Sequence, residues 1–148
     1  LLGYACVNFG TPVSVRAWTR QRGIAWSELD RAQRQAEVAA LGEHLMSQVG
    51  SLVPVLPVPL VATVLLVEPQ RALSRLELKA AVGERVTALK ARGAQLYVPR
   101  QDWDYAVDAG LRMLTQRHLV NEHDGLFMPR QNELPLLRYY ANSIAHLA

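Results

Sequence analysis

The residues of this chain that could bind a metal ion are close together in the sequence: His118, Glu122 and His123. The inverted zinc motif is H-x-x-E-H on a helix, and the present spacing is one residue longer. The stretch also adjoins Asp124–Gly125, a dipeptide typical of a hairpin turn, where the two histidines would not converge. We therefore interpret these side chains as part of a surface turn and expect no metal ligands in the chain.

The histidines do not form a catalytic pair with an acid. Transfer of an acyl group to a hydroxyl needs a His base held by an acidic partner, and one local arrangement is H-x-x-x-x-D. No histidine here has an aspartate five positions later; the four are His44, His118, His123 and His146. We expect no catalytic residue, and without a phosphate loop or G-x-S-x-G motif we expect no cofactor.

The most specific polar pattern is near the end of the chain. Arg138, Asn142 and His146 recur every four residues, which places them on one face of a predicted helix. Such a stripe is normally the solvated side of an amphipathic helix. The functional alternative is that it contacts a neighbouring domain or binds an anionic group of a substrate.

Composition limits the class of protein. The 148 residues are 50% hydrophobic and 20% charged, with a net charge of +3, which is typical of a folded domain. This small excess of positive charge suits a phospholipid surface or an acidic substrate, but it is too small for a dedicated nucleic-acid binder. The one cysteine, Cys6, excludes a disulfide within the chain and indicates a reducing compartment. The chain lacks a signal-peptide pattern and starts at Leu1 rather than Met, so we expect it to be part of a longer protein.

The elements that must position these residues are organised around Leu52–Val67, the most apolar stretch. It is shorter than the about 20 residues of a membrane span and is interrupted by prolines. We predict an extended Leu52–Val58 followed by a short buried helix, Pro59–Val67, at the hub of the fold.

Capping and spacing signals predict four further helices around this hub. They begin at Ser27, Ser74, Asp102 and Asn132 and end near Val49, Arg92, Arg117 and Leu147. The first is expected to bury Val38, Leu41, Leu45 and Val49, with Gly50 just after its end. The second is expected to bury Leu78, Val82, Val86 and Leu89, with Gly83 marking a close helix contact, and the last to bury Leu136, Tyr140, Ile144 and Leu147. A hairpin is expected around Asp124–Gly125.

The first 26 residues have a different pattern. Leu1–Val15 is rich in strand-forming residues, and a lone strand needs neighbours, so we predict that it ends a sheet formed by preceding sequence. Arg16–Trp26 is either a helix-and-loop connection whose tryptophans pack on the sheet edge or a basic, aromatic patch for a membrane surface.

Three stretches carry a family resemblance. VNFGTPVSV at Val7–Val15 resembles the strand and turn after the last acyltransferase block of the large bacterial glycerol-3-phosphate acyltransferases. LRYYANSIAHL at Leu137–Leu147 is similar to their C-terminal helix. VPLVATVLL, followed by the capped helix start at Leu73–Ser74, is similar in order and spacing.

The resemblance implies a role and a fold class. These enzymes transfer an acyl group from acyl-CoA or acyl-carrier protein to the first hydroxyl of glycerol 3-phosphate, peripherally at the cytoplasmic face of the inner membrane. Their His/Asp dyad and phosphate-binding arginines lie upstream of VNFG, so no catalytic residue maps here. The implied fold is mainly α (α+β): residues 1–26 end an α/β acyltransferase domain, and residues 27–148 form a helical, bundle-like C-terminal domain with one small β-hairpin. The expected partners are the upstream catalytic domain and the membrane surface, with no nucleic acid.

Two alternatives from other classes remain at this stage. Helix, helix and hairpin over Ser74–Pro129 resemble a winged-helix DNA-binding module, although Asp102, Asp104 and Asp108 on the candidate recognition helix would repel phosphate. The other alternative is a membrane-docking or interaction domain with no enzymatic parent.

Overall fold

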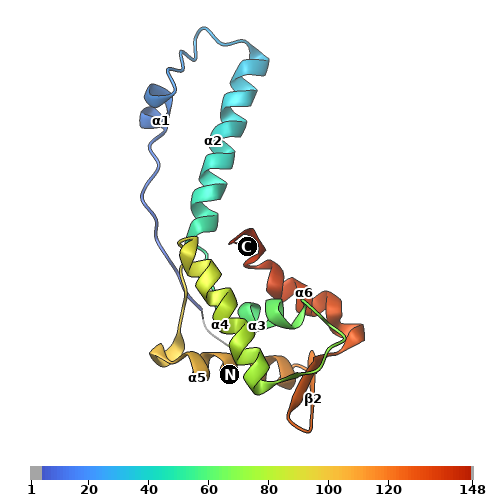
Figure 1. Cartoon of the computed structure of the whole chain (residues 1–148). Coiled ribbons are helices and arrows are strands. Elements are labelled where there is room, and N and C mark those ends of the chain that lie inside the picture. Colours follow the sequence, from blue (N-terminus) through green and yellow to red (C-terminus); the bar gives the residue numbers. More distant parts are fainter. Residues whose placement is uncertain (1–4, 148) are drawn as a thin grey trace. The chain divides into compact units, whose positions relative to one another are not determined.

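The computed structural model describes residues 5–147, which form mainly helices with a small antiparallel sheet (Figure 1). This confirms the mainly α fold class. In chain order, the helices and strands are α1 Val15–Gln21, α2 Arg31–Leu52, α3 Pro57–Leu65, β1 Leu73–Ser74, α4 Arg75–Ala91, α5 Trp103–Gln116, β2 Val120–His123, β3 Leu126–Pro129 and α6 Leu134–Asn142. Short 3₁₀ turns lie at Pro99–Gln101, Gln131–Glu133 and Ala145–Leu147.

The chain divides into two compact units. The smaller one is Val7–Leu52, and the larger one holds Ala5, Cys6 and the described residues from Val53 onward. The sequence predicts that residues 1–26 belong to a preceding α/β domain and that a second domain begins at residue 27. The division into these two units does not test that boundary, which stays a prediction.

Helix α3 is the hub of the larger unit, as predicted from its composition. Seven of its nine residues are buried, and it contacts α4, α5 and α6 (Figure 1). The helix begins at Pro57, two residues earlier than predicted, because a proline in the first turn needs no N–H partner. Within residues 5–147 no helix is long and apolar enough to cross a membrane.

Helix α4 follows the predicted pattern. Ser74 and Glu77 form a reciprocal capping box, and Gly93 ends the helix with a φ of 77°. The buried side chains are those of the predicted stripe: Leu78, Val82, Val86 and Leu89. The close helix contact suggested for Gly83 is absent, since a Cβ there would meet no described atom within 4 Å.

The close contact lies instead at Gly110 on α5. A Cβ at this position would be 2.8 Å from the carbonyl oxygen of Pro57 and 3.1 Å from Cγ2 of Val61. Asp102 caps α5 as predicted by accepting a hydrogen bond from the Tyr105 N–H. The absence of a side chain at Gly110 therefore allows the backbones of α3 and α5 to touch.

The predicted hairpin forms and gains a third strand. Strands β2 and β3 pair across a turn at Asp124–Gly125, whose φ values are 50° and 75°, and β1 pairs with the other edge of β3. From α3 to β3 the order is helix, strand, two helices and hairpin, which is the winged-helix-like order expected from the sequence.

The last helix is shorter than predicted. Helix α6 begins at Leu134 rather than at Asn132, and it stops at Asn142. The Ser143 and Ile144 N–H groups bond three residues back, which tightens the chain into 3₁₀ geometry. Leu137, fully buried, takes the inner position predicted for Leu136, which is 44% exposed.

Helix α2 of the smaller unit corrects three expectations. It begins at Arg31 rather than Ser27 because Asp30 and Gln33 form the capping hydrogen bonds. It also continues through Gly50 to Leu52. Its expected buried stripe is not buried, and Val38, Leu45 and Val49 are 59%, 40% and 57% exposed.

The predicted strand at the start of the chain does not form in the described residues. Residues 5–14 are neither helix nor strand, and Leu1–Tyr4 lie outside the described residues. The Asn8 side chain donates a hydrogen bond to the Leu52 carbonyl oxygen, 2.8 Å away, which ties this segment to the end of α2.

The Arg16–Trp26 stretch is a helix and loop. Trp18 of α1 packs against the His44 ring of α2, with 4.8 Å between ring centroids, and Trp26 donates to the Thr19 hydroxyl. The tryptophans thus pack as the connection hypothesis predicted, although Trp18 meets a helix rather than a sheet edge.

We predict opposite effects for alanine at the two mid-helix glycines. Gly110→Ala should lower the free energy of unfolding by about 1–3 kcal/mol, because its methyl group would collide with backbone atoms of α3. Gly83→Ala should raise it by about 0.5–1 kcal/mol, since helix propensity improves without a clash. Urea unfolding followed by far-UV circular dichroism measures both. A stabilised Gly110→Ala variant would contradict the close approach.

We also predict an acid-sensitive helix start. Hydrogen bonds from the Ser74 backbone and hydroxyl, and then Arg71, lower the pKa of Glu77 from its ordinary value of 4.5. The pKa is lower in the folded state, so this stabilisation is present above about pH 4.5 and is lost as pH falls through the folded-state pKa.

The stability advantage of the wild type over Glu77→Gln should therefore shrink as pH falls below 4.5 in urea titrations. Glu84→Gln, on the same helix, is the matched control, because Glu84 forms no ion pair with the described residues. An advantage over Glu77→Gln that stays constant across this range would refute the role of the capping carboxylate.

Candidate functional site

The predicted polar stripe does not form one continuous face. Arg138 and Asn142 are exposed on α6, whereas His146 lies in the 3₁₀ turn Ala145–Leu147. The change from α to 3₁₀ geometry at Ser143 breaks the four-residue period that placed His146 beside the other two. Their proposed binding role gains no support from this placement and stays a prediction.

The candidate metal ligands are surface residues. His118, Glu122 and His123 are all exposed. His123 Nδ1 lies 3.0 Å from a carboxylate oxygen of Asp124, its neighbour in the hairpin turn. Within residues 5–147, no group of three or more His, Cys, Asp or Glu side chains could hold a metal ion.

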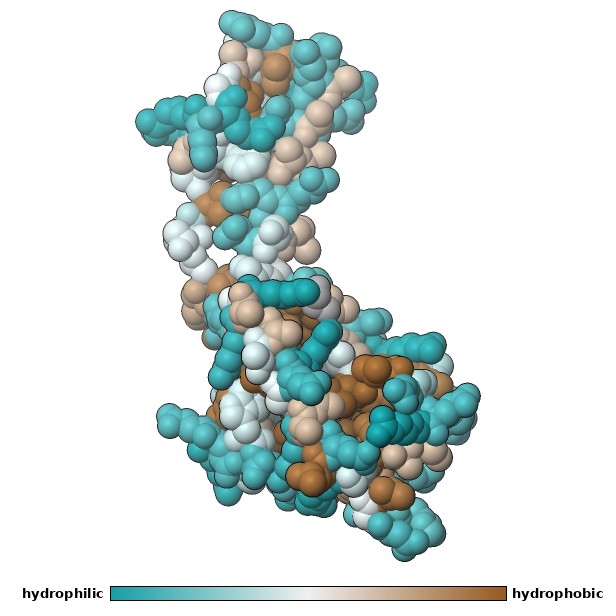
Figure 2. All heavy atoms as spheres, viewed as in Figure 1, coloured by the Kyte–Doolittle hydropathy of each residue, from teal (hydrophilic) through white to brown (hydrophobic). Residues whose placement is uncertain are grey.

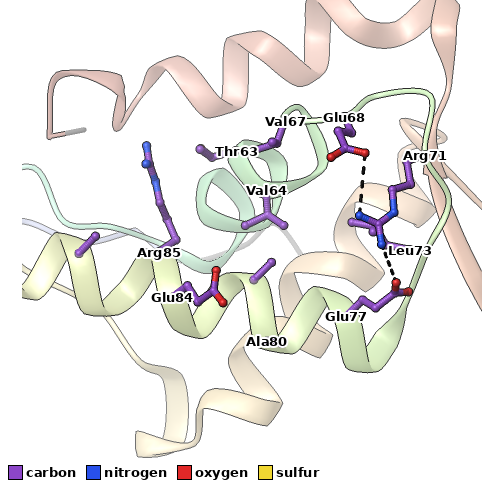
Figure 3. Close-up of a pocket in the computed structure, with 12 residues that line it drawn as sticks. Thr63, Val64, Val67, Glu68, Arg71, Leu73, Glu77, Ala80, Glu84 and Arg85 are labelled. Carbon is purple, nitrogen blue, oxygen red and sulfur yellow. Dashed lines mark hydrogen bonds and ion pairs between the residues drawn. The ribbon is translucent and has the colours of Figure 1, made fainter.

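The clearest concave feature of the larger unit is a groove between α3 and α4, with a volume of about 630 Å³ (Figure 3). We call it the α3–α4 groove. Apolar and small side chains form its walls, including Val64 and Val67 from the α3 side and Ala80 and Ala88 from α4. Polar groups stand along it: Thr63, Glu68, Arg71, Glu77, Glu84 and Arg85.

The two arginines of the groove have different surroundings. Arg71 lies 2.8 Å from a carboxylate oxygen of Glu77 and 3.9 Å from one of Glu68, so acidic groups flank it on both sides (Figure 3). Arg85 stands at the opposite end in the same view. Its Nε atom is buried and has no hydrogen-bond partner among the described residues.

Sequence reasoning missed this groove because it left the charged Arg85 in solvent, although Arg85 lies three residues after Val82 and four before Leu89 and therefore borders the buried stripe of α4. Helical spacing identifies the buried stripe of α4 correctly, but it cannot show that one nitrogen of the neighbouring arginine is shielded from solvent and unpaired among the described residues. The position of Arg85 beside the stripe was the available signal, and the groove itself forms only when α3 and α4 pack together.

The smaller unit has an exposed apolar surface of its own. No residue of α1 or α2 is buried, and hydrophobic side chains are visible on the part that contains these helices in Figure 2. A groove of about 450 Å³ runs between α2 and the extended segment before α1. We define the α2 face as the exposed side chains Val38, Leu45, Met46 and Val49.

The structure gives no support to the DNA-binding alternative, although the winged-helix-like order is present. Asp104 and Asp108 of α5 pair with Lys79 and Arg75 of α4 at 3.2 Å each. These contacts occupy cations beside the candidate recognition helix and leave acidic groups on it, which opposes binding to phosphates.

Comparison with known proteins identifies the family. The family model described as "Glycerol-3-phosphate acyltransferase C-terminal region" matches residues 1–148. A relative named glycerol-3-phosphate acyltransferase from Hamiltonella defensa subsp. Acyrthosiphon pisum is 24% identical over 99% of this chain. One of the same name from Pasteurella multocida is 26% identical over 99% of the chain.

The extent of these matches defines what the chain represents. It spans 19% of the length of each of these relatives. No solved structure matches significantly. Because the family model covers every residue, the chain belongs to the glycerol-3-phosphate acyltransferase C-terminal region family.

Proposed function

We propose that this chain is the C-terminal region of an enzyme that acylates the first hydroxyl of glycerol 3-phosphate. The acyl donor is acyl-CoA or acyl-carrier protein, and the product is lysophosphatidate for phospholipid synthesis. The family match over residues 1–148 carries the proposal, and the names of the two relatives support it.

Within that enzyme, the role of this region is structural or regulatory rather than chemical. Acyl transfer needs a base held by an acid, and the sequence has no H-x-x-x-x-D pair. His123, which does meet an aspartate, lies at the end of β2 with a 90% exposed side chain, so its surroundings do not hold it in place as a base.

The smaller unit connects this region to the catalytic part of the enzyme. A helix within a protein draws most of its stability from tertiary packing of its apolar face, yet α2 buries none of its residues. The α2 face therefore packs against preceding parts of the protein, and residues 1–26 complete the α/β domain there.

The parent enzyme associates peripherally with the cytoplasmic side of the inner membrane. The net charge of +3 favours contact with anionic phospholipid. A peripheral mode needs no membrane-spanning helix from this region.

Activity assays test the chemical part of the proposal. The full-length enzyme should convert radiolabelled glycerol 3-phosphate and acyl-CoA to lysophosphatidate, and the isolated chain should form none, because it lacks the His/acid pair. Product formation by the purified chain would overturn the non-catalytic role. A full-length protein that is folded but inactive with both acyl donors would overturn the enzyme assignment.

A charge introduced on the α2 face tests the docking role. In the full-length enzyme, Leu45→Glu should reduce soluble, active protein at least several-fold, because a carboxylate would be buried without a partner. Ser47→Glu, exposed on the opposite side of the same helix, is the matched control and should behave like wild type. Yield and specific activity are the readouts, and equal values for both variants would show that the face stays in water.

A further inference from the structure

We propose that the α3–α4 groove binds a helix from the part of the enzyme that precedes this chain. An acidic side chain of that helix pairs with Arg85. The inference rests on the proposed function, because it assumes that the chain is the end of a longer enzyme. It goes further by assigning a second docking site, in the larger unit, and the chemistry of its occupant.

The unsatisfied atom of Arg85 points to an anionic group. Its Nε is shielded from solvent and donates to none of the described residues, and Arg85 has no ion-pair partner among them. A buried donor without an acceptor costs free energy. A carboxylate accepts from the guanidinium edge that includes Nε, so an Asp or Glu entering the groove would remove this cost.

The walls of the groove fit a helix. Ala80, Ala81 and Ala88 present small side chains along α4, and Val64 and Val67 provide an apolar wall from the α3 side (Figure 3). Helices pack 8–10 Å apart, and small contact residues allow the closer distances. Val67 is 76% exposed, so apolar surface remains available at the rim for an additional element to cover.

The charges of the groove favour a protein segment over a lipid or a free anion. The groove is lined by three carboxylates, those of Glu68, Glu77 and Glu84, and by only two guanidiniums. Arg71 is already flanked by two of the acids. An anionic head group near Arg85 would also lie near Glu84, whereas a helix can place an acid against Arg85 and a cation against Glu84.

The occupant is assigned to the same enzyme because most of that enzyme lies outside the chain. The chain spans 19% of the length of its relatives, and the matching family is their C-terminal region. The preceding sequence is tethered to this chain, and tethering raises its effective concentration at the groove. A weakly apolar groove can then be filled without a tight intrinsic affinity.

Cysteine labelling tests the inference. Ala88→Cys is placed in the groove and Gln116→Cys on the exposed surface of α5, each in the isolated chain and in the full-length enzyme. A maleimide reagent is applied, and the labelled peptides are quantified by mass spectrometry. We expect the Ala88→Cys thiol to react at least about tenfold more slowly in the full-length enzyme, with no change at Gln116→Cys.

A second substitution tests the arginine. Adding Arg85→Ala to the full-length Ala88→Cys variant should restore most of the labelling rate, because the acid of the docked helix would lose its partner. Arg92→Ala, at the C-terminal cap of the same helix, is the matched control and should leave the thiol protected. Arg85→Lys, which keeps the charge, should restore less labelling than Arg85→Ala.

Several outcomes would overturn the inference. Equal labelling of Ala88→Cys in both proteins would show that the groove is open. Protection that is already present in the dilute isolated chain would assign the groove to another part of this chain. Protection that increases with the concentration of the isolated chain would assign it to a second copy, and protection that appears only with anionic phospholipid vesicles would assign it to a membrane. Lysophosphatidate synthesis is measured in the same full-length samples, so loss of the groove inference is distinguishable from failure of the proposed function.

Discussion

The larger unit depends on the burial of one short helix that has no polar face. Helix α3 is nine residues long, too short to be stable in water alone. Its side chains Leu60, Val61, Val64 and Leu65 are buried among α4, α5 and α6, and each fully buried side chain of this size contributes about 1.5–3 kcal/mol. The proline-led start and the missing side chain at Gly110 let the surrounding backbones approach it closely.

The two units differ greatly in how far they bury the apolar surface of their helices. The larger one surrounds α3 with a continuous apolar core and a three-stranded sheet. The smaller one has a well-capped helix of 22 residues that buries none of them. A unit that leaves Val38 and Val49 in water has an amphipathic pattern but lacks its partner surface. This contrast supports the proposal that the α2 face packs against another part of a larger enzyme.

The winged-helix-like arrangement of this chain does not carry the charge pattern that nucleic acid needs. Arg75 and Lys79 pair with aspartates of α5, and Lys90 and Arg100 lie over the rings of Trp103 and Tyr105 on the same helix. Arg85 of α4, by contrast, has a shielded nitrogen with no hydrogen-bond partner among the described residues. The surface that is left for a partner therefore favours protein over nucleic acid.

The sequence alone determined the elements whose signals are local. Capping residues and helical spacing located α4 and its four buried side chains, Asp124–Gly125 located the hairpin, and three short stretches identified the family. Spacing reports which side of a helix is apolar, but not whether another surface covers it, so the stripe on α2 was wrongly expected to be buried. Only the tertiary structure decided three features: Gly110 rather than Gly83 makes the close contact, α6 stops before His146, and Arg85 keeps a shielded, unpaired nitrogen. The first and third depend on atoms that are distant in the sequence, and the second depends on how the end of the chain packs.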